Sequence, residues 1–451
     1  MPFLGSIGPD EGGYAYVAWR WSRGADLYRS VWIDRPQGLI VVYRLLISIS
    51  HSAWAIRLGA VVAGATITLL IVAIGRLLAS PEAGFLAGGL YAIAGIGPHI
   101  EGYTFNGELA ASVPATAAVA AVLVARRRDS RRWLVAAGTF GGSAILMKQS
   151  GFDGLAVVFV VAALGRGRLK SLALVLAGAA VPLGASVIAG WVSGWRFYWS
   201  AVVGDHLGAV TSASRLGHLG SSLPAATRDL LLLSALALVG LWLARKQPLQ
   251  LRVGLAWLVA ALAGVNVGGL YWPHYYVQLL PPLCLLAGLA LARLRDRRVA
   301  WAAVALAVLP ALGFVAGVVK APERQQDLMV KYALGFENDQ RIARYVRAHS
   351  SSREDVYALE SRADFYFLAS RPAAYPYLWG QPIRAIPGAL ASLERTLASP
   401  RRPKLVVLFQ RSPLRRHRLL RAIIDRYYRR IWSAPRTGTP VLASVGGSPR
   451  A

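Results

Sequence analysis

Long apolar runs separated by short polar segments recur between residues 54 and 318. A helix needs about 20 predominantly apolar residues to cross the hydrocarbon core of a bilayer. The runs near this length lie at residues 54–75, 83–103, 107–125, 132–148, 151–166, 171–191, 229–244, 251–268, 274–293 and 299–318. The pattern therefore predicts an α-helical polytopic membrane protein with about ten spans.

Residues 36–51, which precede the first span, have a different pattern. Their apolar side chains form one stripe and their polar side chains fall on another face, the first made of Val41, Val42, Leu45, Leu46 and Ile49 and the second of Arg44, Ser48 and His51. A strong moment with a charge in mid-segment favours a helix that lies in the membrane interface over one that spans it.

The pattern changes again from about residue 319, where apolar and polar residues mix as in soluble domains. Residues 339–350 and 418–433 have the periodicity of amphipathic helices, and residues 355–360 and 404–409 that of short buried strands. The sequence thus predicts three parts: an external loop with an interfacial helix at 1–53, a membrane domain at 54–318, and a small soluble α/β domain at 319–451.

Composition supports a membrane protein, since 55% of the 451 residues are hydrophobic and only 16% are charged. The net charge of +28 could indicate nucleic-acid binding, but many of the arginines fall in short loops between apolar runs. We therefore expect no nucleic-acid partner. The single cysteine, Cys284, excludes an intramolecular disulfide and any metal site built from several cysteines.

The loop charges predict the orientation in the membrane. One alternate set of loops is rich in basic residues, namely Arg76, Arg126, Arg127, Arg128, Arg131, Arg132, Arg166, Arg168, Lys170, Arg245, Lys246, Arg252, Arg293, Arg295, Arg297 and Arg298. Cytoplasmic loops carry such an excess. The opposite set, together with residues 1–53 and 319–451, is then extracytoplasmic in a multi-pass protein of the cell membrane.

Residues 9–38 combine adjacent carboxylates with interleaved aromatic and arginine residues, which suits either a site or a solvated tail. No apolar span precedes Pro9 to carry this segment across the membrane. One hypothesis is that translation starts upstream and a first span is missing, and the alternative is direct translocation of a short tail.

The carboxylates of Asp10 and Glu11 are candidates for a general base or a metal ligand, because an ionised oxygen accepts a proton or binds a hard cation. Arg35 can bind a phosphate through its planar fork, or meet lipid headgroups as an ordinary interfacial arginine.

Further candidates fall on the same predicted face. Glu101 and Glu108 flank one outer turn, where carboxylates are either functional or solvated. Lys148 ends an apolar run as a phosphate contact or a snorkelling lysine. His274 sits in an aromatic belt as a site or a structural residue. Asp205 and His206 lie in the external loop 192–228 without a supporting motif.

Several of these segments resemble a known family. Asp10-Glu11 with Tyr14, Gly24 to Tyr28 and Arg35-Pro36-Gln37 resemble the first external loop of the C-type membrane glycosyltransferases (GT-C). The resemblance is to the branch of the protein O-mannosyltransferases and lipid A aminoarabinose transferases. Other segments follow in the family's order, namely 54–64, 105–111, 146–151 and 274–283.

The resemblance implies a transferase that moves a sugar from a polyprenyl-phosphate donor to an acceptor hydroxyl of a lipid, glycan or protein on the outer face of the membrane. It implies that Asp10 is the base, with Glu11 and Glu108 as further acidic site residues and Arg35 and Lys148 on the donor phosphate. Tyr14, Glu101 and His274 are the other expected substrate contacts. A divalent metal stays open and none is assigned, and Arg35-Pro36-Gln37 departs from the family's Lys-Pro-Pro.

Two other functions fit the same pattern. In a transporter or flippase for a lipid-linked or anionic substrate, membrane carboxylates would bind ions or protons. Against this, the candidate charges gather at one face and no inverted repeat is visible. The other alternative is a non-catalytic assembly protein that displays the C-terminal domain.

Overall fold

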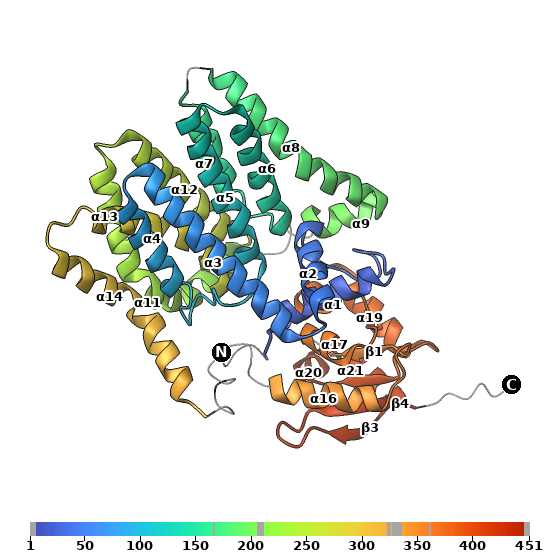
Figure 1. Ribbon diagram of the computed structural model, residues 1–451. Helices are drawn as coiled ribbons and strands as arrows, with labels where there is room; N and C mark the ends of the chain where they lie inside the picture. The colour runs from blue at the N-terminus through green and yellow to red at the C-terminus, as the bar shows by residue number, and fades with distance from the viewer. Residues whose placement is uncertain are drawn as a thin grey trace.

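A computed structural model describes residues 6–165, 167–204, 212–322, 326, 336–359 and 362–445. Asp205, His206 and Arg166 lie outside the described residues. The chain folds into a body of long helices with a mixed helix and strand region at one end (Figure 1).

The apolar runs predicted from the sequence form helices, although some are too short to cross a bilayer alone. Over the described residues, 7 helices are long and apolar enough to span a membrane. They are α3 (Ala53–Leu78), α5 (Gly107–Arg128), α8 (Arg168–Val192), α11 (Ser212–Ala244), α12 (Pro248–Val267), the continuous pair η2 (Pro273–Leu279) and α13 (Leu280–Leu291), and α14 (Arg297–Lys320). The shorter ones are α4 (Pro81–Ala94), α6 (Arg131–Met147) and α7 (Asp153–Ala162). The predicted fold class is confirmed, with about ten spans as an approximate count.

The predicted span 83–103 is wrong in its second half, since α4 ends at Ala94. The following residues Gly95, Gly97 and Pro98 disfavour a continued helix, and the backbone forms successive turns up to Phe105. These turns fold over the end of the helical body and carry Glu101 into its interior.

Opposite charges lie at opposite ends of this body. In α5, Glu108 occupies the first turn and Arg126, Arg127 and Arg128 the last. A helix of this length separates its ends by about 33 Å. Helix α6 runs back from Arg131 and is capped by Lys148, which returns to the end that holds Glu108.

The N-terminal segment predicted as a loop begins instead with a helix, α1 (Pro9–Ser22). Pro9 suits the first helical position, and the two carboxylates in the first turn favour the positive end of the helix dipole. The predicted amphipathic helix is present as α2 (Gln37–Ile49). Its apolar stripe is exposed in the structure, with Leu45 62% exposed, as a helix against lipid requires.

The C-terminal region contains a four-stranded sheet in the order β1-β2-β4-β3. Its elements are α16 (Phe336–Ala348), β1 (Val356–Ala358), α17 (Ala363–Ala369), α18 (Gly380–Ala385), α19 (Ala389–Ala398), β2 (Leu405–Val407), α20 (Ser412–Arg416), α21 (Arg418–Tyr427), β3 (Tyr428–Ser433) and β4 (Pro440–Ser444). Strands β1 and β2 are parallel, and β4 pairs antiparallel with both β2 and β3.

The predicted helix 418–433 is wrong beyond Tyr427, where the chain turns into β3. Pairing of β3 with β4, for example Arg430 with Leu442, outweighs the local helical pattern. The whole region packs on the N-terminal helices, and α17 lies directly against α1 (Figure 1). Two small elements, α9 (Trp195–Trp199) and the π-helical turn η1 (Ser200–Gly204), complete the described chain beside α8.

Candidate active site

Glu11 is held in a buried ion pair and does not face open space. Both of its carboxylate oxygens bind Arg57 of α3, with Nη1 to Oε1 and Nη2 to Oε2 each 2.7 Å. The backbone amides of Gly8 and Phe105 donate to the same carboxylate at 2.9 and 2.8 Å. Glu11 therefore ties the start of α1 to α3 and to the turns before α5, and its oxygens have no lone pair left for a substrate.

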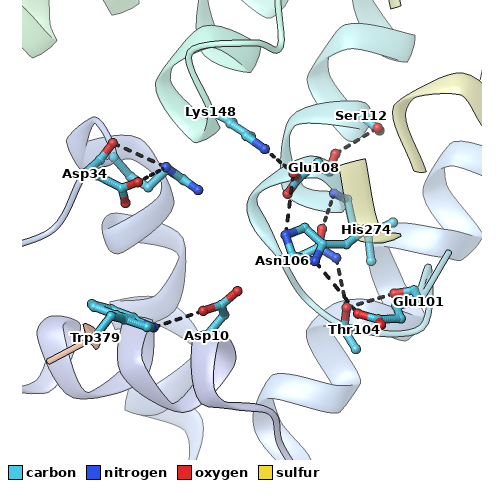
Figure 2. A network of polar contacts seen from close by, with 12 residues as sticks. Asp10, Asp34, Glu101, Thr104, Asn106, Glu108, Ser112, Lys148, His274 and Trp379 are labelled. Atoms are coloured by element: carbon cyan, nitrogen blue, oxygen red, sulfur yellow. Dashed lines mark hydrogen bonds and ion pairs between the residues drawn. The ribbon is translucent and has the colours of Figure 1, made fainter. Parts of the chain in front are cut away.

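Asp10 has a different environment, although it is the adjacent residue. Its side chain is only partly buried and lines a small cavity of about 40 Å³ that also contacts Glu101, Asn106 and His274. The indole Nε1 of Trp379 donates a hydrogen bond to Asp10 Oδ1 at 3.0 Å. Figure 2 shows the Asp10 carboxylate directed toward the residues around His274 and away from the helix that carries it.

Burial raises the pKa of the Asp10 carboxyl above its usual range. The charges of His274 and Arg35 and the hydrogen bond from Trp379 lower this pKa again, but only in part, while Asp34 adds to the increase. A carboxylate with a raised pKa and one oxygen directed toward a cavity has the properties of a general base.

Glu108 and Lys148 are brought together from α5 and the end of α6. Lys148 Nζ donates to Glu108 Oε1, and both side chains are buried. The same ammonium lies 3.7 Å from the centre of the Tyr275 ring. Lys148 is therefore no snorkelling lysine, because its charge is directed inward and paired.

His274 lies between the two glutamates predicted for the site. Its Nδ1 is 3.8 Å from Glu101 Oε2, and its Nε2 is 3.8 Å from Glu108 Oε1. Glu101 adopts a left-handed backbone conformation with φ of 55°, an uncommon state for a residue other than glycine. The loop thereby places a carboxylate that is 0% exposed beside the imidazole, and none of these three residues is a solvated surface group.

Arg35 lines a second, larger cavity of about 270 Å³ together with Lys148. Its guanidinium is buried and pairs with Asp34, and Tyr28 donates to its backbone carbonyl at 3.0 Å. Gln149 fixes this turn, since its Nε2 donates to the carbonyl of Asp34 at 2.7 Å. The remaining walls are mostly apolar and come from the membrane helices and from α18, including Val202, Leu270, Pro382 and Ile386.

Tyr14 is buried between α2 and the C-terminal region. Its ring lies 5.5 Å from the Tyr43 ring and 5.9 Å from the Trp379 ring. The structure thus places Tyr14 beside Asp10, in an aromatic wall.

Two residues of the site escaped the sequence analysis. Arg57 had been noted only as an isolated charge in an external loop, and Trp379 is separated from Asp10 by 369 residues. No local motif signals either contact, because each forms only when distant elements pack. Over the described residues, no group of three or more His, Cys, Asp or Glu side chains is arranged to hold a metal ion.

Comparison with known proteins agrees with this architecture. Residues 34–191 match the family model described as dolichyl-phosphate-mannose-protein mannosyltransferase. None of the curated proteins matches the sequence.

Solved structures match nearly the whole chain. ArnT from Cupriavidus metallidurans bound to undecaprenyl phosphate is 18% identical with a TM-score of 0.68, over 98% of this chain and 94% of ArnT. The apo form of ArnT gives 17% identity and a TM-score of 0.66, over 97% and 94% of the two chains. The oligosaccharyltransferase AglB from Archaeoglobus fulgidus, in complex with an inhibitory peptide and a dolichol-phosphate, is 12% identical with a TM-score of 0.52. That match covers 97% of this chain and 71% of AglB.

These matches confirm the resemblance predicted from the sequence. The chain has the fold of the C-type membrane glycosyltransferases, in the form seen in ArnT.

Proposed function

We propose that this protein is a membrane glycosyltransferase that moves a sugar from a polyprenyl-phosphate donor to an acceptor hydroxyl. The observation that carries the proposal is the contrast around Asp10. Within the described part of the chain Asp10 forms no ion pair, and it lines a cavity at the end of the helical body where Arg35 and Lys148 are buried. A base and a pair of cations are the two things that this reaction requires.

The proposed step is a single displacement. Asp10 accepts the proton of the acceptor hydroxyl, whose oxygen forms a bond to the anomeric carbon of the sugar. The bond from that carbon to the phosphate oxygen breaks, and its electron pair leaves with the polyprenyl phosphate. Arg35 and Lys148 stabilise the charge that grows on the departing phosphate. The configuration at the anomeric carbon is inverted, as the family resemblance implies.

The other acidic residues have supporting roles in this proposal. Glu108 neutralises Lys148 before the donor binds and contacts His274 from the other side. Glu11 acts through its pair with Arg57, which fixes the first turn of α1 and with it the position of Asp10. Tyr14, Glu101 and His274 form the walls that face the sugar and the acceptor.

The donor class is supported by the chemistry of the larger cavity. Two buried cations suit a phosphate, and apolar walls that include Val202 and Leu270 suit the first isoprene units. ArnT was observed with undecaprenyl phosphate and AglB with a dolichol-phosphate. The arginine-rich loops at the opposite end of the helices support an extracytoplasmic site in the cell membrane.

The decisive experiment replaces Asp10 by Asn, which keeps the shape of the side chain and removes its basicity. Membranes containing Asp10→Asn are incubated with radiolabelled polyprenyl-phosphate sugars, and transfer to an extractable product is measured. Transfer should fall by about 100-fold or more, the scale of a general base. Asp26→Asn is the matched control, because Asp26 is exposed in the same segment and should keep full activity.

Unchanged transfer by Asp10→Asn would remove Asp10 as the base. A transporter or flippase gives a different result in the same assay. It would move the labelled lipid between leaflets without forming any new glycosidic product.

A further inference from the structure

The C-terminal region reaches the proposed base through one side chain, Trp379. Its Nε1 donates to Asp10 Oδ1 at 3.0 Å, and its ring packs beside Tyr14 with 5.9 Å between the ring centres. Figure 2 shows the indole behind the Asp10 carboxylate, on the side away from His274. Trp379 therefore contacts the oxygen of Asp10 that is turned away from the small cavity.

We propose that Trp379 is a positioning residue for Asp10, which holds one carboxylate oxygen so that the other faces the acceptor hydroxyl. This inference rests on the proposed function, since it assigns a partner to the proposed base. It also changes the role of the C-terminal region, which becomes part of the active site.

The close contact is built into α1. A Cβ atom on Gly13 would lie 2.3 Å from Cζ2 of Trp379 and 2.8 Å from Cβ of Ala363 in α17. Such distances are too short for any side chain, so only glycine at position 13 lets the indole lie against the helix. The residue next to the carboxylates thus fits the residue that binds one of them.

The segment after Trp379 touches the other half of the site. Gln381, Pro382, Ala385 and Ile386 line the larger cavity with Arg35 and Lys148. One short stretch therefore contacts Asp10 at one end and walls the cavity for the donor at the other. This arrangement couples the placement of the base to the closure of that cavity.

A neutral N–H that donates to a carboxylate stabilises the ionised form, so its loss should make Asp10 harder to ionise. The charged groups around Asp10 come from several elements and remain in place when Trp379 is changed: His274, Glu101, Arg35, Asp34 and Asp364. The effect of the lost hydrogen bond can therefore be measured against a constant electrostatic background.

The test compares Trp379→Phe with Trp432→Phe in membranes that also contain the wild type and Asp10→Asn. Trp432 is a matched control, since it lies in the same region but stacks on Tyr345, with 4.4 Å between ring centres. We expect Trp379→Phe to lower kcat about tenfold or more, with KM for the donor within about twofold of wild type. The acid limb of its pH profile should move to higher pH, whereas Trp432→Phe should leave that limb unchanged.

An acid limb of Trp379→Phe at the wild-type position would overturn the inference. This readout does not depend on how much of the variant folds, because only active molecules contribute to the profile. If Asp10→Asn is inactive while Trp379→Phe matches wild type, the inference fails and the proposed function stands. If Asp10→Asn retains transfer, the proposed function itself fails.

Discussion

Asp10 and Glu11 are adjacent carboxylates with opposite surroundings. Glu11 is 2% exposed and satisfied by Arg57 and by two backbone amides, whereas Asp10 receives one neutral hydrogen bond at the edge of a cavity. Buried polar groups that are fully bonded stabilise a structure, and those that keep an oxygen available can react. The two residues should therefore respond differently to pH and to substitution.

Activity should depend on the ionisation of Asp10. Because burial raises its pKa above the ordinary value of 3.8, the carboxylate becomes protonated at a higher pH than an exposed aspartate does. A protonated Asp10 cannot accept the acceptor's proton, so kcat should fall as pH falls through this raised pKa. The measurement is the pH profile of kcat with saturating donor, and an acid limb at or below 3.8 would contradict the prediction.

Glu11 should matter for stability before it matters for rate. Glu11→Gln leaves the Arg57 guanidinium buried without its counter-ion, a change that typically costs about 3 kcal/mol or more. We expect a clear loss of thermal stability for the detergent-purified protein, measured by intrinsic fluorescence or by aggregation on heating.

Glu354→Gln provides the control for this comparison. Glu354 pairs with Lys404 at 2.9 Å, but both side chains are exposed to solvent, so the pair should contribute little. Equal stability losses for Glu11→Gln and Glu354→Gln would show that the Arg57 pair has no special role.

At the scale of elements, the contact between α1 and α17 joins the N-terminal helix to the C-terminal region. A Cβ atom on Gly12 would lie 2.4 Å from the Cα atom of Asp364, so the two backbones touch here. Buried Asp364 pairs with Arg362 at 3.1 Å, and this holds the start of α17 in place. The glycines after Asp10 and Glu11 therefore define a helix face as closely as the carboxylates define a site.

Gly12→Ala should separate the two elements. Backbone atoms cannot move aside as a flexible side chain can, so α17 must shift and draw Trp379 away from Asp10. We expect lower transfer and faster proteolysis between residues 322 and 336 and within the C-terminal region. Gly24→Ala is unsuitable as a control because Gly24 has a φ of 87°, whereas Gly89→Ala in α4 faces open space and should be neutral. Wild-type transfer by Gly12→Ala would contradict the tight contact.

Much of this arrangement could be predicted from local pattern. The apolar runs fixed the helices, the moment of residues 36–51 predicted α2, and the residues predicted for one face lie at one end of the body. What could not be predicted depends on pairs far apart in the chain. Glu11 meets Arg57 across 46 residues and Asp10 meets Trp379 across 369 residues, and neither partner stands out in its own segment.

Local pattern also misled where tertiary pairing decides the outcome. Residues 428–433 continue the helical periodicity of α21 but pair with β4 as a strand. Residues 9–22 lack an apolar run and yet form α1, because its apolar and aromatic side chains are buried between α2 and the C-terminal region.

At the scale of the whole molecule, charge is segregated along the membrane normal. Glu108, Lys148 and His274 lie at the end of the helices that holds the C-terminal region, and Arg126, Arg127 and Arg128 lie at the other. The arginine-rich end should face the cytoplasm and the site should face the opposite side. Both faces can be tested with the same reagent.

Cysteine labelling in intact cells measures this orientation directly. The single native cysteine, Cys284, is fully buried and should give no background with a membrane-impermeant thiol reagent. Ser352→Cys, at an exposed position of the C-terminal region, should be labelled in intact cells. Arg127→Cys, exposed at the opposite end, should be labelled only after the membrane is permeabilised. The reverse pattern would place the proposed site in the cytoplasm, where a donor presented on the outer leaflet could not reach Asp10.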